Sequence, residues 1–171
     1  MGFHITRLWG YLTGLIVIGI IIYLILLYVT AQSLAAKVTG IESVGFDPLS
    51  NSVKTCFTVQ VNNTGPLDVT IEKIYYKIYV DNKYLGEGVK KNIIIGKGSS
   101  NIKLCLTAES KAIADSLAEI IVHGGKVNVT VEGYVEIPIK SFGVIKLWTV
   151  QLPFKKTVEV NIYTSKIKWG G

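Results

Sequence analysis

The sequence predicts a mainly β protein: an antiparallel β-sandwich of the fibronectin or immunoglobulin kind, with about seven strands and one α-helix. One N-terminal transmembrane helix precedes this sandwich. Three observations carry the prediction. Residues 8–29 have no charged side chain, most segments beyond residue 50 alternate apolar and polar residues, and only residues 109–122 have helical spacing. The 171 residues are 49% apolar with a mean hydropathy of +0.42, which is high for a soluble domain.

The apolar run is long enough to cross a bilayer. As a helix, its 22 residues from Leu8 to Val29 would span about 33 Å, against a hydrocarbon core of about 30 Å. Arg7 precedes the run, and Trp9 and Tyr28 lie near its two ends, where aromatic residues favour the water–lipid interface. We therefore expect a single-pass cell-membrane protein with a cytoplasmic N-terminus and an extracytoplasmic head.

Two other interpretations of this run stay open. Small residues follow it (Thr30, Ala31, Ser33, Ala35), as at a signal-peptide cleavage site, although a signal's apolar core is usually about 7–15 residues long. A pilin-like subunit also carries an apolar N-terminal helix before a β-rich head, but this run has no acidic residue. We expect an uncleaved anchor that contacts the lipid bilayer.

Composition and alternation divide the chain into five parts: residues 1–7 (cytoplasmic), 8–31 (transmembrane helix), 32–49 (linker and first-strand region), 50–160 (sandwich head) and 161–171 (tail). Within the head, alternation predicts strands at about 55–62, 71–80, 83–89, 93–95, 101–107, 127–139 and 145–160. Asp81-Asn82 is a tight-turn pair between two of them. Thr107 or Ser110 can cap the helix, and Gly124-Gly125 ends it.

The two cysteines lie on strands whose apolar residues face the other way. Cys56 precedes the inward Phe57, and Cys105 lies between two leucines, so both thiols should point out of the core. If these strands are antiparallel neighbours, the cysteines can form a disulfide; otherwise they are inert thiols. We expect the disulfide, because an exterior head lies in an oxidising compartment.

Some exterior residues suggest modification or contact. Asn62 and Asn128 begin glycosylation sequons. Tyr75, Lys77 and Tyr79 form an outward stripe, which serves either as cross-strand packing under a loop or as a contact surface. In the tail, Tyr163, Ile167 and Trp169 alternate and could add a strand to a neighbouring molecule's edge.

No residue pattern indicates catalysis. The head has one histidine, His123, and no cluster with metal-ligand spacing, so we expect no enzyme activity, no cofactor and no metal. The lysines are spread along the chain, which suits a solvated surface or weak attraction to anionic lipids or glycans. Arg7 is the only arginine, which argues against nucleic-acid binding.

The order of these segments resembles a known family, the group 2 late embryogenesis abundant proteins, also called the water-stress and hypersensitive-response (WHy) domain. The resemblance covers about residues 40–160. It rests on residues 57–63, 67–71, 74–82, 85–88, 96–104, 125–133 and 152–154. The family usually has Asn-Pro-Asn after the first strand, where this chain has Asn-Asn-Thr-Gly-Pro at 62–66.

The resemblance implies a β-sandwich without catalytic residues and a stress-related protective or interaction role near a membrane. An apolar anchor before such a domain is similar to the plant membrane-bound members. We therefore expect a binding or protective module whose partners are envelope proteins or glycans. The alternative is a structural subunit of a surface filament or envelope assembly, which self-associates through its N-terminal helix or its C-terminal strand.

Overall fold

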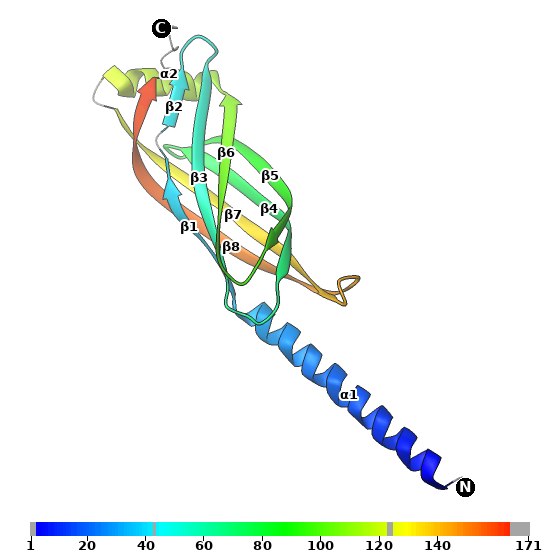
Figure 1. Ribbon diagram of the computed structural model, residues 1–171. Helices are drawn as coiled ribbons and strands as arrows, with labels where there is room; N and C mark the ends of the chain where they lie inside the picture. The colour runs from blue at the N-terminus through cyan, green and yellow to red at the C-terminus, as the bar shows by residue number, and fades with distance from the viewer. Residues whose placement is uncertain (1–2, 43, 123–124, 165–171) are drawn as a thin grey trace, which may run out of the picture.

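The computed structural model describes residues 3–42, 44–122 and 125–164, and it shows a long helix joined to a two-layered β head (Figure 1). The prediction of a mainly β fold with an N-terminal apolar helix is confirmed. The elements are α1 (Phe3–Gln32), β1 (Leu34–Ile41), β2 (Val44–Asp47), β3 (Ser52–Asn63), β4 (Val69–Val80), β5 (Lys83–Ile95), β6 (Gly98–Glu109), α2 (Lys111–Val122), β7 (Lys126–Ser141) and β8 (Ile145–Thr164).

One layer of the head is the antiparallel sheet β5-β4-β7-β8. The other layer is built on β3, whose one edge pairs with β1 and then β2 and whose other edge pairs with β6. The turn between β4 and β5 has positive φ at Asp81 (46°) and Asn82 (64°), which is the geometry of the predicted tight hairpin.

The structure has eight strands, where the sequence predicted about seven, and one of its pairings is parallel. The region 32–49, which the sequence predicted as a linker with a first strand, contains both β1 and β2. The two strands predicted at 83–89 and 93–95 are instead one strand, β5. Short β2 pairs in parallel with the end of β8, with Val44 opposite Ile162 and Phe46 opposite Thr164. This seam joins the two layers into one continuous hydrogen-bonded sheet.

The core lies between the layers, and strand alternation determines which residues enter it. On β3, Phe57, Val59 and Val61 are buried, and on β4 the buried residues include Ile74 and Ile78, as the alternation predicted. The ring of Phe57 meets the buried Tyr76 edge-on, with centroids 5.0 Å apart. Burial of this apolar surface is the main force that holds the two layers together.

Helix α2 begins where Ser110 accepts a 3.4 Å hydrogen bond from the amide of Ile113, so Ser110 is the cap. It ends with the amide of Gly125 bonded to the carbonyl of Ile120. Ile113 and Leu117 are buried, which anchors the apolar stripe of the helix on the core. His123 lies outside the described residues.

The last turns of α1 belong to the head. Leu27, Thr30 and Ala31 are buried there, whereas from Leu8 to Leu26 the apolar side chains are exposed, apart from the half-buried Tyr23. A Cβ on Gly65 would lie 2.6 Å from the Cα of Thr30, so only glycine permits the loop to approach the helix this closely. The segment Leu8–Gln32 is the one described helix long and apolar enough to cross a membrane, which a signal sequence also is.

Candidate functional site

The outer surface of the β5-β4-β7-β8 sheet gathers tyrosines and lysines, and we call it the tyrosine–lysine face. It comprises Tyr75, Lys77, Tyr79, Tyr84 and Tyr134. The first three alternate with the buried residues of β4, so they project from the opposite side of the sheet and are half-buried. Strand pairing then adds the other two: Tyr134 of β7 lies opposite Tyr75, and Tyr84 of β5 lies opposite Tyr79.

Ring contacts order this face. Tyr75 and Tyr134 have centroids 5.4 Å apart, and Tyr79 and Tyr84 meet edge-on at 5.8 Å. The Nζ of Lys77 lies 5.8 Å from the Tyr75 centroid, and that of Lys73 lies 5.4 Å from the Tyr134 centroid. Aromatic pairs and cation–π contacts of this kind hold side chains in place at a wet surface.

Charged hydrogen bonds fix the face further. The Tyr75 hydroxyl donates a 2.6 Å hydrogen bond to Oε2 of Glu87, which raises the pKa of the phenol and lowers the pKa of the carboxyl. Lys73 and Glu136 form a 3.0 Å ion pair. It raises the pKa of the lysine and lowers the pKa of the glutamate below its ordinary value.

Two shallow hollows, of about 320 and 380 Å³, open side by side on this face, and Glu132 and Lys155 line both. These two side chains form an ion pair at 3.3 Å. One hollow is also lined by Tyr75 and Tyr134 and the other by Tyr79. The face therefore offers aromatic edges, a carboxylate and an ammonium group within one surface, which suits contact with a polar polymer or protein surface better than enclosure of a small molecule.

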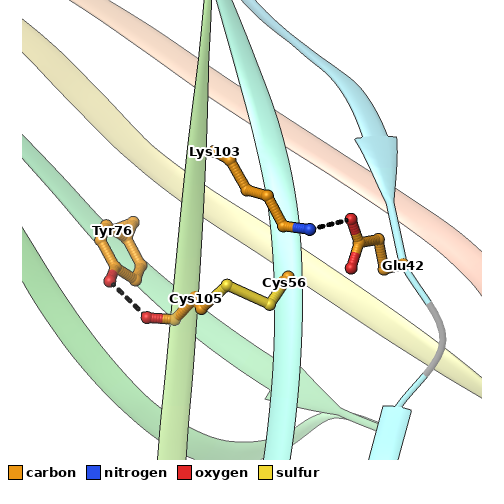
Figure 2. The surroundings of a disulfide bond; sticks show 5 residues. All are labelled: Glu42, Cys56, Tyr76, Lys103 and Cys105. Atoms are coloured by element: carbon orange, nitrogen blue, oxygen red, sulfur yellow. Dashed lines mark hydrogen bonds and ion pairs between the residues drawn. A yellow bond between two sulfur atoms is a disulfide. The ribbon is translucent and has the colours of Figure 1, made fainter.

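The other sheet carries a disulfide between Cys56 and Cys105, which lie directly opposite each other with Cα atoms 4.1 Å apart (Figure 2). Cys105 is exposed, but Cys56 is buried, so the thiols do not share the exposed setting that the alternation suggested. The amide of Glu42 bonds to the Cys56 carbonyl, and its carboxylate pairs with Lys103 at 2.6 Å. From the opposite layer, the Tyr76 hydroxyl donates to the Cys105 carbonyl at 3.1 Å.

The sequon asparagines have different surroundings. Asn128 is exposed on β7, beside the β4–β5 turn, where its backbone amide donates to the Asp81 carboxylate. Asn62 is half-buried on β3, and its side-chain oxygen accepts a 2.7 Å hydrogen bond from Ser99. Among the described residues, no hydrogen bond of this kind holds the Asn128 side chain, and modification of either residue stays a prediction.

Part of the predicted contact tail is paired within the chain itself. Residues 161–164 continue β8, and the backbone of Tyr163 lies opposite Gly45 of β2. Ile167 and Trp169 lie outside the described residues. The structure thus brings Tyr75, Lys77 and Tyr79 together but separates them from Tyr163, which is on the seam between the layers.

The described residues contain no group of three or more His, Cys, Asp and Glu side chains that could hold a metal ion. Glu132 and Glu136, two acids on one strand face, each pair with a lysine of a neighbouring strand rather than with each other.

The sequence did not predict Tyr84 and Tyr134 as members of the tyrosine–lysine face, because their positions follow from strand register and not from spacing along the chain.

No family model matches this sequence, and no curated protein matches it. Two solution structures have a similar fold. One is AT1g01470 from Arabidopsis thaliana, with a TM-score of 0.55 and 16% identity over 77% of this chain and 83% of that one. The other is At2g46140.1, titled as a late embryogenesis abundant (LEA) protein, with a TM-score of 0.59 and 16% identity over 78% and 73%.

The head has a LEA-like fold. At such low sequence identity the likeness concerns the fold alone, and it agrees with the resemblance that the order of sequence segments suggested. The head, from β1 to β8, carries both the tyrosine–lysine face and the disulfide.

Proposed function

We propose that this chain is a membrane-anchored, extracytoplasmic module that acts without catalysis, by contacts of its tyrosine–lysine face with envelope partners. One observation carries the proposal: the helical segment Leu8–Gln32 has no charged residue, most of its apolar side chains are exposed, and its last turns pack into the core of the β head. Lipid around this helix would cover its apolar surface, which would otherwise stay in water.

The packing of α1 favours an anchor over a cleaved signal. Thr30 is only 1% exposed, and Leu27 and Ala31 are buried with it. Cleavage after the small residues that follow the run would remove these side chains and uncover Gly65 beneath them. A signal peptide has no such role in the folded product.

Orientation and compartment are supported by charge and chemistry. Arg7 is the charged residue before the span, which favours a cytoplasmic N-terminus. The Cys56–Cys105 disulfide favours an oxidising compartment for the head. The LEA-like fold supports a stress-related protective or interaction role of the kind expected from the family resemblance.

Photo-crosslinking in the source organism's membranes tests the proposal. A photoreactive residue at Tyr79, on the tyrosine–lysine face, should capture envelope protein or glycan. The same residue at Lys103, on the opposite sheet and more exposed than Tyr79, is the control, so any excess of capture at Tyr79 cannot come from greater accessibility. Equal capture at both positions would refute a dedicated contact face.

Electron microscopy of the purified chain separates this function from the structural alternative. Long polymers, with crosslinks between copies through α1, would favour a filament subunit over a binding module. Discrete particles, combined with capture at Tyr79, support the module.

A further inference from the structure

The tip of the β7–β8 hairpin exposes a cluster of apolar side chains, which we call the apolar tip: Phe142, Val144, Ile145, Leu147 and Trp148. The loop residue Phe142 is 76% exposed, and all five side chains are exposed. Hairpin tips in water are normally polar, and a contiguous exposed apolar group marks a surface that meets another apolar phase. Figure 1 shows this loop in orange, at the same end of the head as α1.

The apolar tip touches α1 well inside the segment that can span a membrane. The ring of Phe142 stacks on that of Tyr23, with centroids 5.1 Å apart, and its amide donates a 3.0 Å hydrogen bond to the Tyr23 hydroxyl. Tyr23 lies nine residues before the helix end at Gln32, which is about 14 Å along the axis. A hydrocarbon core about 30 Å thick that begins near Leu8 ends near Tyr28, so Phe142 lies below its surface.

A second contact with α1 places the β7–β8 hairpin at a consistent depth in the bilayer. Trp148, three residues into β8, lines a hollow of about 570 Å³ together with Tyr28 and Gln32. Tyr and Trp concentrate at the water–lipid interface, where Tyr28 already lies. The hairpin thus follows the helix, with Trp148 level with Tyr28 and Phe142 level with Tyr23.

The lysines beside the tip lie between the levels of Trp148 and Phe142, from where their side chains can reach the headgroup region. Lys140 and Lys146 lie opposite each other on the two strands, and both are exposed. Lysine side chains at this level extend toward lipid phosphates while their stems lie along apolar surface. Lys146 also contacts Glu72 at 3.4 Å, a contact at a surface-exposed position.

The head cannot turn the tip away from the membrane without losing core contacts. Thr30 and Leu27 are buried in the head, and Gly65 lies against Thr30 at a distance that leaves no room for a Cβ. Helix and head therefore meet in a packed junction rather than a free linker.

We infer that the apolar tip enters the head-side leaflet of the bilayer that α1 crosses and forms a second lipid contact there, so that the head is held against the bilayer at two points. This inference rests on the proposed membrane anchor. The apolar tip is then a lipid-binding element that lies more than a hundred residues from α1 in the sequence.

The test places a photoreactive phenylalanine analogue in the full chain, reconstituted in phosphatidylcholine–phosphatidylglycerol vesicles, and identifies adducts by mass spectrometry. The probe replaces Phe142 in one variant and Leu49 in the matched control. Leu49 is 78% exposed in the β2–β3 loop, at the far end of the head. Because β3 has 12 residues, Leu49 lies about 40 Å from the tip. A third probe at Ile18, in the middle of α1, reports whether the anchor spans the membrane.

Lipid adducts at Phe142 and Ile18, at about ten times or more the yield at Leu49, are expected, since only the first two positions lie in hydrocarbon. Lipid adducts at Ile18 with none at Phe142 would overturn the tip contact and leave the anchor intact. Crosslinks from Phe142 to a second copy, without lipid adducts, would also overturn it and assign the tip to self-association.

No lipid adduct at Ile18 would overturn the proposed anchor itself, and the tip contact with it. The same probe at Val144, which is 82% exposed, repeats the measurement in case the Phe142 variant folds poorly. Lipid adducts at Val144 are sufficient to support the tip contact. Lipid adducts at Ile18 with none at Val144 would refute the tip contact.

Discussion

Replacing both cysteines by alanine, Cys56→Ala with Cys105→Ala, should lower the free energy of unfolding of the head by about 4 kcal/mol. The disulfide closes a loop with a sequence separation of 49 residues. In the chain-entropy relation, closing a loop of that length lowers the entropy of the unfolded chain by about 14 cal/mol/K. At 25 °C this raises the free energy of the unfolded chain by about 4 kcal/mol. Crosslinking constrains the unfolded chain, so removing it makes unfolding more favourable.

The native sheet itself should survive this change. Strands β3 and β6 pair over 12 residues each, from Ser52 opposite Glu109 to Asn63 opposite Gly98. The backbone hydrogen bonds on both sides of the cysteines therefore stay in place. For a head of this size, about 4 kcal/mol corresponds to a fall in melting temperature of about 15 °C.

Circular dichroism of the full chain in detergent, heated with and without reductant, measures the effect. The matched control is Lys54→Ala with Thr107→Ala, the cross-strand pair two residues away on the same face. Removing a non-covalent pair of this kind should cost less than about 1 kcal/mol. Equal melting temperatures for the two double variants would refute the loop-entropy reasoning. Free thiols at both cysteines in non-reducing mass spectrometry would refute the bond itself.

Three further changes test particular contacts. Thr55→Val should stabilise the head by about 1 kcal/mol in urea denaturation, because the buried Thr55 hydroxyl has no hydrogen-bond partner among the described residues; a loss of stability would contradict this reading. Gly133→Ala should destabilise the head by about 1–3 kcal/mol, since the new Cβ would lie 2.0 Å from a β4 carbonyl oxygen. In the control Gly40→Ala, the new Cβ meets nothing within 4 Å and should have little effect. Because Lys73 lowers the pKa of Glu136 below its ordinary 4.5, this ion pair contributes stability above pH 4.5 that is lost as the pH falls through the lowered pKa. Glu136→Gln should therefore flatten the acid limb of a melting-temperature profile, and an unchanged limb would refute the assignment.

The sequence predicted the parts of the fold that depend on local pattern. Alternation placed Phe57 and Ile78 in the core because a strand presents every second residue to one side. Asp81 and Asn82 identified the β4–β5 turn because both residues adopt positive φ more readily than most. The same kind of local rule offered Thr107 or Ser110 as the helix cap, and the structure selects Ser110.

The features that the sequence did not predict depend on contacts between distant segments. Strand β2 has four residues and no alternation of its own, so only its partners identify it as a strand. The membership of Tyr84 and Tyr134 in the tyrosine–lysine face follows from register between strands. Phe142 is an ordinary loop residue in the sequence, and its importance arises only from its position beside Tyr23.

The parallel seam between β2 and β8 affects how the head is made. Val44 pairs with Ile162, so over a hundred residues must leave the ribosome before β2 gains its second neighbour. Until then the edge of β2 is open and the two layers are not joined, a state in which unpaired strands invite wrong partners. A nascent chain tethered by α1 would wait in this state at the membrane surface. Closure of this parallel seam is then a late, slow event, as is usual for contacts between residues far apart in a chain.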